Sequence, residues 1–172
     1  MSGFPEASEV EQRLLDLGYS VPGVVTPLAS YVPALGHGDL TYSSGQLPLA
    51  DGALHAVGKV GRGGDVSLEQ AQQCARLCAL NAVAAVKSVV GDLDRVTQVI
   101  KVTGFVASDP GFTDQHLVLN GASELLGHAF GPAGVHARSA VGVAVLPMNS
   151  PVEVEVVVSI GPTDRVDEPA GQ

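Results

Sequence analysis

Two neighbouring segments near the C-terminal end constrain the fold more than any other feature. Residues 137–146 read Ala-Arg-Ser-Ala-Val-Gly-Val-Ala-Val-Leu, and residues 152–160 read Val-Glu-Val-Glu-Val-Val-Val-Ser-Ile. Alternation of apolar residues with period two is typical of β-strands. Between them, Met148-Asn149-Ser150-Pro151 predicts a turn, so we expect the two strands to form a tight hairpin.

The first of these strands places one guanidinium at the end of a row of very small side chains. Arg138 shares its strand face with Ala140, Gly142 and Ala144, because side chains two residues apart point to the same side. Such a row packs closely against another element or leaves room for a small ligand. Arginine is well suited to hold a carboxylate through two parallel hydrogen bonds. The alternative for Arg138 is a surface salt bridge.

The remaining patterns predict three helices and four further strands. Two helices are opened by capping-box patterns, Ser8-x-x-Glu11 and Ser67-x-x-Gln70. The helices are expected at about 8–17, 67–90 and 113–130, and the strands at 30–35, 40–48, 54–60 and 95–106. This order predicts an α+β fold, in which a single mixed β-sheet carries the two long helices on one face.

Length and charge restrict the class of protein. A chain of 172 residues is long enough for one domain with a substantial core. The net charge of −9 opposes binding to nucleic acid, whose affinity comes largely from cations on phosphates. No apolar run approaches the roughly 20 residues that span a membrane. Residues 1–6 lack the basic flank and apolar core of a secretory signal. We therefore expect a cytoplasmic protein that binds neither nucleic acid nor membrane.

Cysteine and histidine spacing gives little sign of a metal or redox site. Cys74 and Cys78 lie four residues apart on one face of a predicted helix, where two small core residues are the simpler interpretation than a redox pair or half a metal site. The five histidines have no metal-ligand spacing, so no metal site is predicted.

Several motifs together resemble one known family. Arg138-Ser139-x-Val-x-Val-x-x-Leu-Pro, followed by Val-Glu-Val-Glu, resembles the C-terminal signature of the RidA/YjgF family. Ser44-Gly45-Gln46-Leu47-Pro48 resembles its N-terminal pattern, with Tyr31 at the same spacing before the serine. The matching residues outside these two motifs are Asn81, Phe105-Val106 and Asn120. The resemblance indicates a family domain at 26–161, an N-terminal helical extension at 1–25 and a flexible tail at 162–172.

The resemblance implies a chorismate mutase-like fold, a homotrimer and an activity. Many members hydrolyse reactive enamines and imines derived from amino acids to 2-oxo acids and ammonia, without a cofactor, in clefts between subunits. By the resemblance, Arg138 holds the substrate carboxylate and Glu153 positions the hydrolytic water. A solvated edge glutamate is the alternative for Glu153. The candidate substrate-binding residues are completed by Tyr31, Ser44, Gly45 and Asn120. Tyr31 could pack on the ligand or be a core tyrosine, and Ser44 and Gly45 could offer a hydroxyl and a backbone N–H or simply end a strand. A structural role is the alternative for Asn120.

The predicted hairpin has a consequence for this site. Arg138 would pair near its open end and Glu153 near the turn, about seven residues of strand or roughly 23 Å apart. One chain could not then bring both side chains to one small substrate. We therefore predict a site assembled across a subunit interface.

Two departures from the family pattern keep other functions open. Ala140 and Gly142 stand where well-studied deaminases have cysteine and glutamate, so thiol chemistry at that position is excluded. A protein that binds small carboxylates without catalysis is the first alternative. An endoribonuclease, a description that some relatives carry, is the second, and the acidic charge argues against it.

Overall fold

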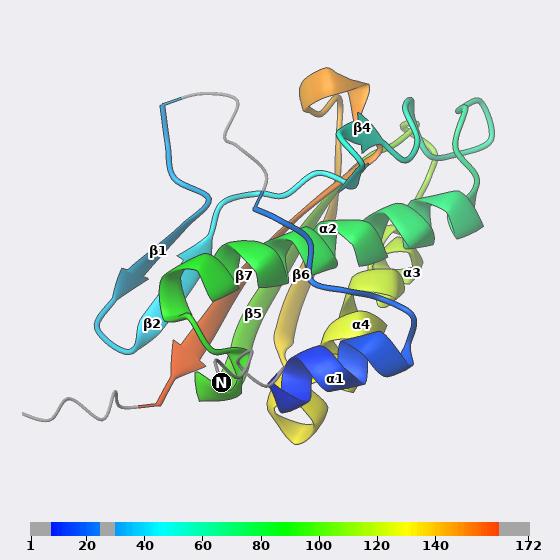
Figure 1. The fold of residues 1–172 in the computed structure, drawn as a ribbon. Coiled ribbons are helices and arrows are strands. Elements are labelled where there is room, and N and C mark those ends of the chain that lie inside the picture. The colour runs from blue at the N-terminus through cyan, green and yellow to red at the C-terminus, as the bar shows by residue number, and fades with distance from the viewer. Residues whose placement is uncertain (1–7, 25–29, 162–172) are drawn as a thin grey trace, which may run out of the picture.

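The computed structural model describes residues 8–24 and 30–161, which form one mixed sheet with helices on it. The helices are α1 (Glu9–Asp16), α2 (Leu68–Val90), α3 (Gln115–Val118) and α4 (Asn120–Phe130). The strands are β1 (Ala34–His37), β2 (Leu40–Ser43), β3 (Leu49–Ala50), β4 (Ala53–Leu54), β5 (Val96–Ala107), β6 (Ala137–Val143) and β7 (Val152–Ile160). The main sheet has the order β1-β2-β7-β5-β6, and β3 pairs with β4 (Figure 1). The predicted fold class is confirmed.

Helix α2 forms the centre of the core, as its sequence predicts. Ser67 caps its first turn through a reciprocal capping box with Gln70, and Gly91 ends it at φ 79°. Its buried face is rich in alanine, with the two cysteines among the buried residues. A small face allows close packing: a Cβ built on Gly121 of α4 would lie 2.0 Å from the Gln72 carbonyl oxygen. The two helices therefore meet backbone to backbone on the sheet.

Among the described residues, α2 alone is long and apolar enough to cross a membrane. Its most apolar window has a mean hydropathy of 1.2, and 67% of that window is buried within the domain. A core helix passes the same test of length and composition, and this degree of burial identifies α2 as a core helix.

Strand β5 separates the two segments that were expected to pair as a hairpin. It pairs with β7 in antiparallel and with β6 in parallel orientation. The hairpin prediction is therefore wrong. The chain leaves β5, crosses over through α3 and α4, and returns parallel to it. The connection from β6 to β7 then passes over the end of β5, where the Ala107 N–H donates to the Pro151 carbonyl oxygen.

The structure corrects several predicted boundaries. The first strand lies at Ala34–His37, and the turn that follows it is at Gly38-Asp39. The second strand stops at Ser43, since residues 44–48 contribute only an isolated bridge between Gln46 and Val154. Most of the predicted strand at 54–60 is irregular. Its backbone bonds to other loops instead, as when the Gly58 N–H donates to the Asn149 carbonyl. Leu119 interrupts the predicted third helix and divides it into α3 and α4.

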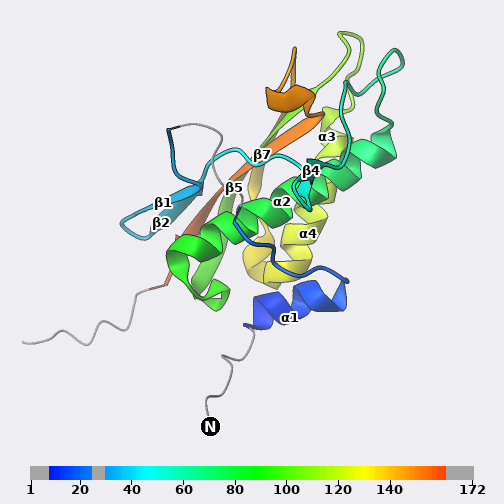
Figure 2. The ribbon, with the colours of Figure 1, turned by 45° about the horizontal axis from the view of Figure 1, so that its top comes forward.

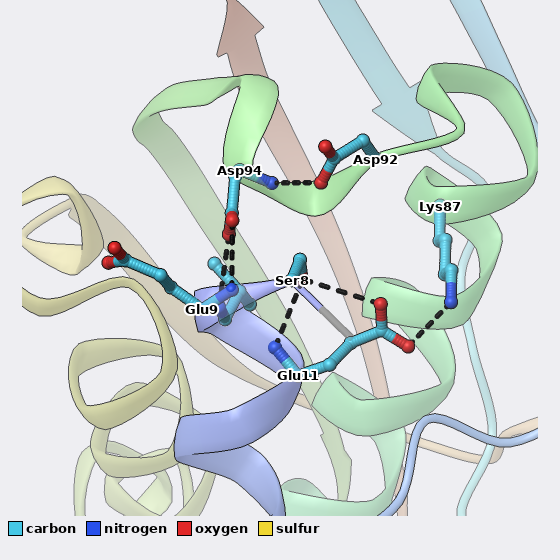
Figure 3. A network of polar contacts seen from close by, with 7 residues as sticks. Ser8, Glu9, Glu11, Lys87, Asp92 and Asp94 are labelled. Atoms are coloured by element: carbon cyan, nitrogen blue, oxygen red, sulfur yellow. Dashed lines mark hydrogen bonds and ion pairs between the residues drawn. The ribbon is translucent and has the colours of Figure 1, made fainter. Parts of the chain in front are cut away.

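Helix α1 is attached to the domain by polar contacts at its N-terminal end (Figure 3). Ser8 caps it by accepting from the Glu11 N–H. Asp94 accepts from the N–H groups of Glu9 and Val10 at 2.8 and 3.0 Å, and Lys87 pairs with Glu11 at 2.5 Å. On the domain-facing side of the helix, its residues Val10 and Leu14 are buried. The predicted domain boundary at residue 25 stays a prediction, and the predicted tail at 162–172 lies outside the described residues.

The second face of the sheet carries no helix among the described residues (Figure 2). Gly104 faces the helices, because a Cβ there would meet the Leu119 side chain at 2.2 Å. Its neighbours Thr103 and Phe105 therefore point to the other face. By the strand register, the following residues share this open face: Tyr42, Lys101, Thr103, Phe105, Ser139, Val141, Glu153, Glu155 and Val157.

Candidate functional site

Arg138 is half-buried on the helix-covered face of the edge strand β6, and neutral groups hold its guanidinium. Its Nη1 donates to Asn120 Oδ1 at 3.1 Å and to Ser123 Oγ at 3.0 Å, and its Nη2 donates to the His116 carbonyl at 3.0 Å. No carboxylate of the described residues lies within 4.0 Å of it. A guanidinium has five N–H donors, so Nε–H and one Nη2–H are without a partner in the described part of the chain. Within the described part of the chain Arg138 therefore forms no salt bridge, and the alternative of a salt-bridged arginine is wrong there.

The row of small residues beside Arg138 packs against another element, which was one of its two expected roles. A Cβ built on Gly142 would lie 2.8 Å from Gln115 Nε2 and 3.0 Å from Ser108 Oγ. Gln115 itself is held by the Phe112 carbonyl at 2.7 Å. Since Gln115 is the first residue of α3, the small side chains let this helix approach β6 closely enough for its His116 carbonyl to reach Arg138.

Glu153 lies with Ser44 and Gly45 at the junction of β2 and β7. Paired backbone hydrogen bonds between Gln46 and Val154 bring the two segments together. Ser44 Oγ donates to the Val32 carbonyl at 2.6 Å, which fixes the strand end. A Cβ on Gly45 would lie 1.8 Å from Glu153 Oε1, so only glycine leaves room for this carboxylate. Burial, and then the nearby charge of Glu155, raise the pKa of Glu153.

Within one chain, Arg138 and Glu153 do not share a pocket. Arg138 lies opposite Val102 of β5, whereas Glu153 lies opposite Phe105, and these positions point to opposite faces of the sheet. Three residues along β5 and two strand spacings separate them, which amounts to about 14 Å between backbone positions. The predicted 23 Å was too long because it assumed a hairpin.

The other two predicted site residues have different surroundings. Asn120 begins α4 and accepts a hydrogen bond from Arg138, so it supports the arginine directly. Tyr31 exposes 48% of its surface, and within the described residues its hydroxyl makes no hydrogen bond. In one chain Tyr31 is therefore an open aromatic side chain rather than a core tyrosine.

Two residues in contact with the arginine network were not predicted. Ser123 accepts from Arg138, and its hydroxyl lies 2.9 Å from Nε2 of His136. The sequence spacing of Ser123 and His136 could have indicated both residues. Ser123 follows Asn120 by three residues on one helix face, and His136 precedes Arg138 by two residues on one strand face.

One of the two buried thiols, that of Cys78, lies close to Glu153. Cys78 Sγ is 3.5 Å from the Val152 carbonyl oxygen, one residue before Glu153. Burial raises the pKa of Cys74 to about 11 and raises that of Cys78 well above its ordinary value. Both are core residues, as predicted. Across residues 8–24 and 30–161, no three His, Cys, Asp or Glu side chains are grouped so that they could hold a metal ion.

Comparison with known proteins places this arrangement in a family. A sequence profile described as "YjgF/chorismate mutase-like, putative endoribonuclease" matches residues 11–160. Protein TCP17 of Trypanosoma cruzi is 40% identical over 155 residues, which cover 90% of this chain and 96% of that protein. The crystal structure of protein Atu1372 from Agrobacterium tumefaciens, described as having unknown function, is 47% identical. It superposes with a TM-score of 0.83 over 89% of this chain and 93% of that one.

A crystal structure from Shewanella oneidensis MR-1 is 32% identical, with a TM-score of 0.84 over 88% of this chain and 99% of that one. The likeness therefore extends over nearly the whole of each relative and includes both the fold and the sequence. The chain belongs to the YjgF/chorismate mutase-like family.

Proposed function

We propose that this protein hydrolyses small imines or enamines derived from amino acids, and that Arg138 binds their carboxylate. The observation that carries the proposal is the state of the Arg138 guanidinium. Three of its N–H donors are fixed by neutral acceptors, which leaves its charge uncompensated by the described residues and two donors on adjacent nitrogens unused. A planar carboxylate is the ligand that such a pair of donors fits best.

The proposed site is completed by a second copy of the chain. Arg138 lies on β6 at one edge of the sheet, whereas Glu153 lies on the other face in the central strand β7, beside Ser44 and Gly45. Tyr42 and Val141 expose 43% and 44% of their surface on the open face, where further apolar residues also lie. If the β6 edge of one copy packed on the open face of a neighbour, these residues would be buried, and Ser44, Gly45 and Glu153 of the neighbour would approach Arg138 at that edge. A homotrimer with sites at its interfaces, working in the cytoplasm, is the expected assembly.

The proposed reaction uses the raised pKa of Glu153. The substrate carboxylate is held at Arg138, so its imine carbon is fixed beside a water bound to Glu153. As the water oxygen bonds to the imine carbon, the Glu153 carboxylate takes one water proton and passes it to the imine nitrogen, which gives a carbinolamine. The carboxylate then moves the remaining hydroxyl proton to the amino nitrogen, the C–N bond breaks, and ammonia and a 2-oxo acid leave. No cofactor is needed because the imine carbon is already electrophilic.

A second candidate function is binding without hydrolysis. The two positions that follow Arg138 on its strand face are Ala140 and Gly142, which have no functional group to act on a bound molecule. If no neighbouring copy supplies Glu153, the arginine site would bind small carboxylates without turning them over.

The deciding experiment measures ammonia release from freshly generated 2-iminopropanoate. Wild type should exceed the uncatalysed rate, Arg138→Ala should lose most of this activity, and Glu153→Gln should lose turnover while retaining affinity for 2-oxobutanoate. Arg62→Ala is the control, since Arg62 is an exposed arginine and its removal changes the net charge equally. Carboxylate binding without turnover would establish the second candidate. Wild type with neither binding nor turnover would refute both.

A further inference from the structure

Arg138 is linked through Ser123 to a histidine that the proposed reaction does not use. Ser123 lies on α4, and His136 lies directly before β6. Arg138 Nη1 is 3.0 Å from Ser123 Oγ, which is 2.9 Å from His136 Nε2, and His136 Nδ1 is 2.5 Å from the Gly134 carbonyl oxygen. Guanidinium, hydroxyl, imidazole and backbone carbonyl thus form a single chain of hydrogen bonds.

The groups at the two ends of this series of hydrogen bonds determine which atom donates in each bond. The Gly134 carbonyl can only accept, so His136 Nδ1 must carry the hydrogen of that bond. In the neutral imidazole Nε2 is then an acceptor, and the Ser123 hydroxyl must donate to it. The Ser123 oxygen has lone pairs left for the Arg138 N–H, and the guanidinium can only donate. Every donor and acceptor is matched, from the arginine to the backbone.

We propose that Ser123 and His136 are positioning residues for Arg138, which they hold in the orientation that binds the substrate carboxylate. This rests on the proposed carboxylate site. A free arginine side chain samples many rotamers, and ordering it on binding reduces affinity. Ser123 holds Nη1 with its hydroxyl fixed by His136. The Nε–H and the remaining Nη2–H are then directed to the ligand before it arrives.

Asn120 holds the same nitrogen from the same helix, so the effect of Ser123 is expected to be partial. Asn120 Oδ1 accepts from Nη1 at 3.1 Å and remains in place when Ser123 is changed. Ser123→Ala should therefore weaken carboxylate binding without abolishing it, and a variant lacking both acceptors should be weaker than either alone. His136 acts only through Ser123, so its effect should disappear in a Ser123→Ala background.

The experiment combines affinity, kinetics and the tautomer of His136. For Ser123→Ala, the Kd for 2-oxobutanoate and the KM for 2-iminopropanoate should rise about 5- to 10-fold, because the loss of one acceptor for Nη1 is partly offset by Asn120. For His136→Leu the rise should be smaller, about 2- to 5-fold, because the Ser123 oxygen can still accept from Nη1 but is no longer held in place. The kcat should stay within about twofold, because the carboxylate is bound equally before and during reaction. Ser123→Thr and His136→Gln, which retain a hydroxyl and an acceptor, should restore wild-type Kd. The ¹⁵N spectrum should show hydrogen on Nδ1 of His136.

Wild-type Kd in both Ser123→Ala and His136→Leu, or hydrogen on Nε2, would overturn the positioning role. Failure of the carboxylate site is recognised separately, because Arg138→Ala would then bind 2-oxobutanoate as tightly as wild type. If only Arg138→Ala loses binding, the carboxylate site stands and the positioning role is refuted. Thermal unfolding of each variant near the wild-type temperature shows that the fold is retained.

Discussion

Gly45 and Glu153 are in such close contact that no side chain fits between them. A Cβ on Gly45 would lie 1.8 Å from Oε1 and 2.7 Å from Cδ of Glu153. Gly45 follows β2 and Glu153 lies in β7, so two distant parts of the sequence depend on each other for the position of one carboxylate. A substitution at Gly45 can therefore test the role of Glu153 without changing Glu153 itself.

Gly45→Ala should displace the Glu153 carboxylate and reduce imine hydrolysis at least about 10-fold, a typical lower contribution of a positioned proton acceptor. Affinity for 2-oxobutanoate should stay near that of wild type, because Arg138 is untouched. Gly111→Ala is the matched control, since a Cβ there meets nothing within 4 Å. Wild-type turnover in Gly45→Ala would contradict a role for Glu153 in catalysis.

The pH dependence of activity should report the raised pKa of Glu153. A proton acceptor must be ionised, so kcat/KM should rise with pH through a pKa above that of an ordinary glutamate, about 4.3. Burial is the main cause of the raised pKa and Glu155 is the second. Glu155→Gln should therefore move the acid limb of the pH profile to lower pH. An unchanged limb in Glu155→Gln would show that another group is titrating.

The same pKa predicts how stability changes with pH. Folding disfavours the ionised form of Glu153, so the free energy of unfolding should fall as pH rises from the unfolded pKa to the higher folded pKa. Glu153→Gln should therefore be more stable than wild type at neutral pH. The difference in stability between the two proteins should vanish below about pH 4, where Glu153 is protonated in both the folded and the unfolded wild type. Chemical denaturation at pH 4 and pH 7 measures it.

Two glycines of α4 should respond in opposite ways to alanine. Gly121→Ala would place a Cβ 2.0 Å from the Gln72 carbonyl of α2 and should destabilise by about 2–3 kcal/mol, as overpacking does. Gly127→Ala meets nothing within 4 Å and should stabilise by up to about 1 kcal/mol through helix propensity. Urea unfolding of both variants is the measurement. Equal effects would mean that α2 and α4 do not touch at Gly121.

The two thiols should be unreactive in the folded protein. With a pKa of about 11, Cys74 is about one part in a thousand thiolate at pH 8, and the pKa of Cys78 is also raised. Iodoacetamide at pH 8 should therefore modify both slowly in the native state and rapidly in urea. Rapid native modification would show that α2 separates from the sheet in solution.

Asp94→Asn should loosen α1 while leaving the sheet intact. Asp94 accepts from two N–H groups at the start of α1, and a helix N-terminus prefers a negative charge. We expect a local loss of about 1 kcal/mol. Faster hydrogen exchange at residues 9–16, with unchanged exchange in β5 and β7, would demonstrate it. Asp51→Asn, in the turn between β3 and β4, is the control. Uniformly faster exchange would mean that α1 supports the whole fold.

Local signals predicted the elements well where they were strong. The capping box at Ser67 and the glycine at 91 predicted α2 to within a residue, and period two predicted β5 and β7 closely. Strand β6 ends at Val143, three residues before the end of its alternating segment. Alternation does not specify which strand a segment pairs with, however. The partner of β6 depends on the long crossover through α3 and α4, and the sequence of residues 137–160 contains no information about it. The segment at 54–60 alternates as a strand does, yet its backbone bonds to neighbouring loops.

Some residues of the candidate site could likewise be predicted from the sequence, and others could not. Arg138 was predicted from its residue type and its small neighbours, and Asn120 from the resemblance. The Ser123–His136 link was missed because it needs the helix and the strand in contact. Gly45 was expected to supply a backbone N–H, whereas its evident role in one chain is to leave space for the Glu153 side chain.

The position of β7 in the sheet has a consequence for biosynthesis. Strand β7, the last strand of the described residues, lies between β2 and β5 and joins the two halves of the sheet. A nascent chain that ends before residue 152 has the β1–β2 hairpin and the β5–β6 crossover unit, and no strand joins them into one sheet. The five-stranded sheet can therefore form only after β7 has left the ribosome, so termination before residue 152 should yield insoluble fragments rather than a smaller folded protein.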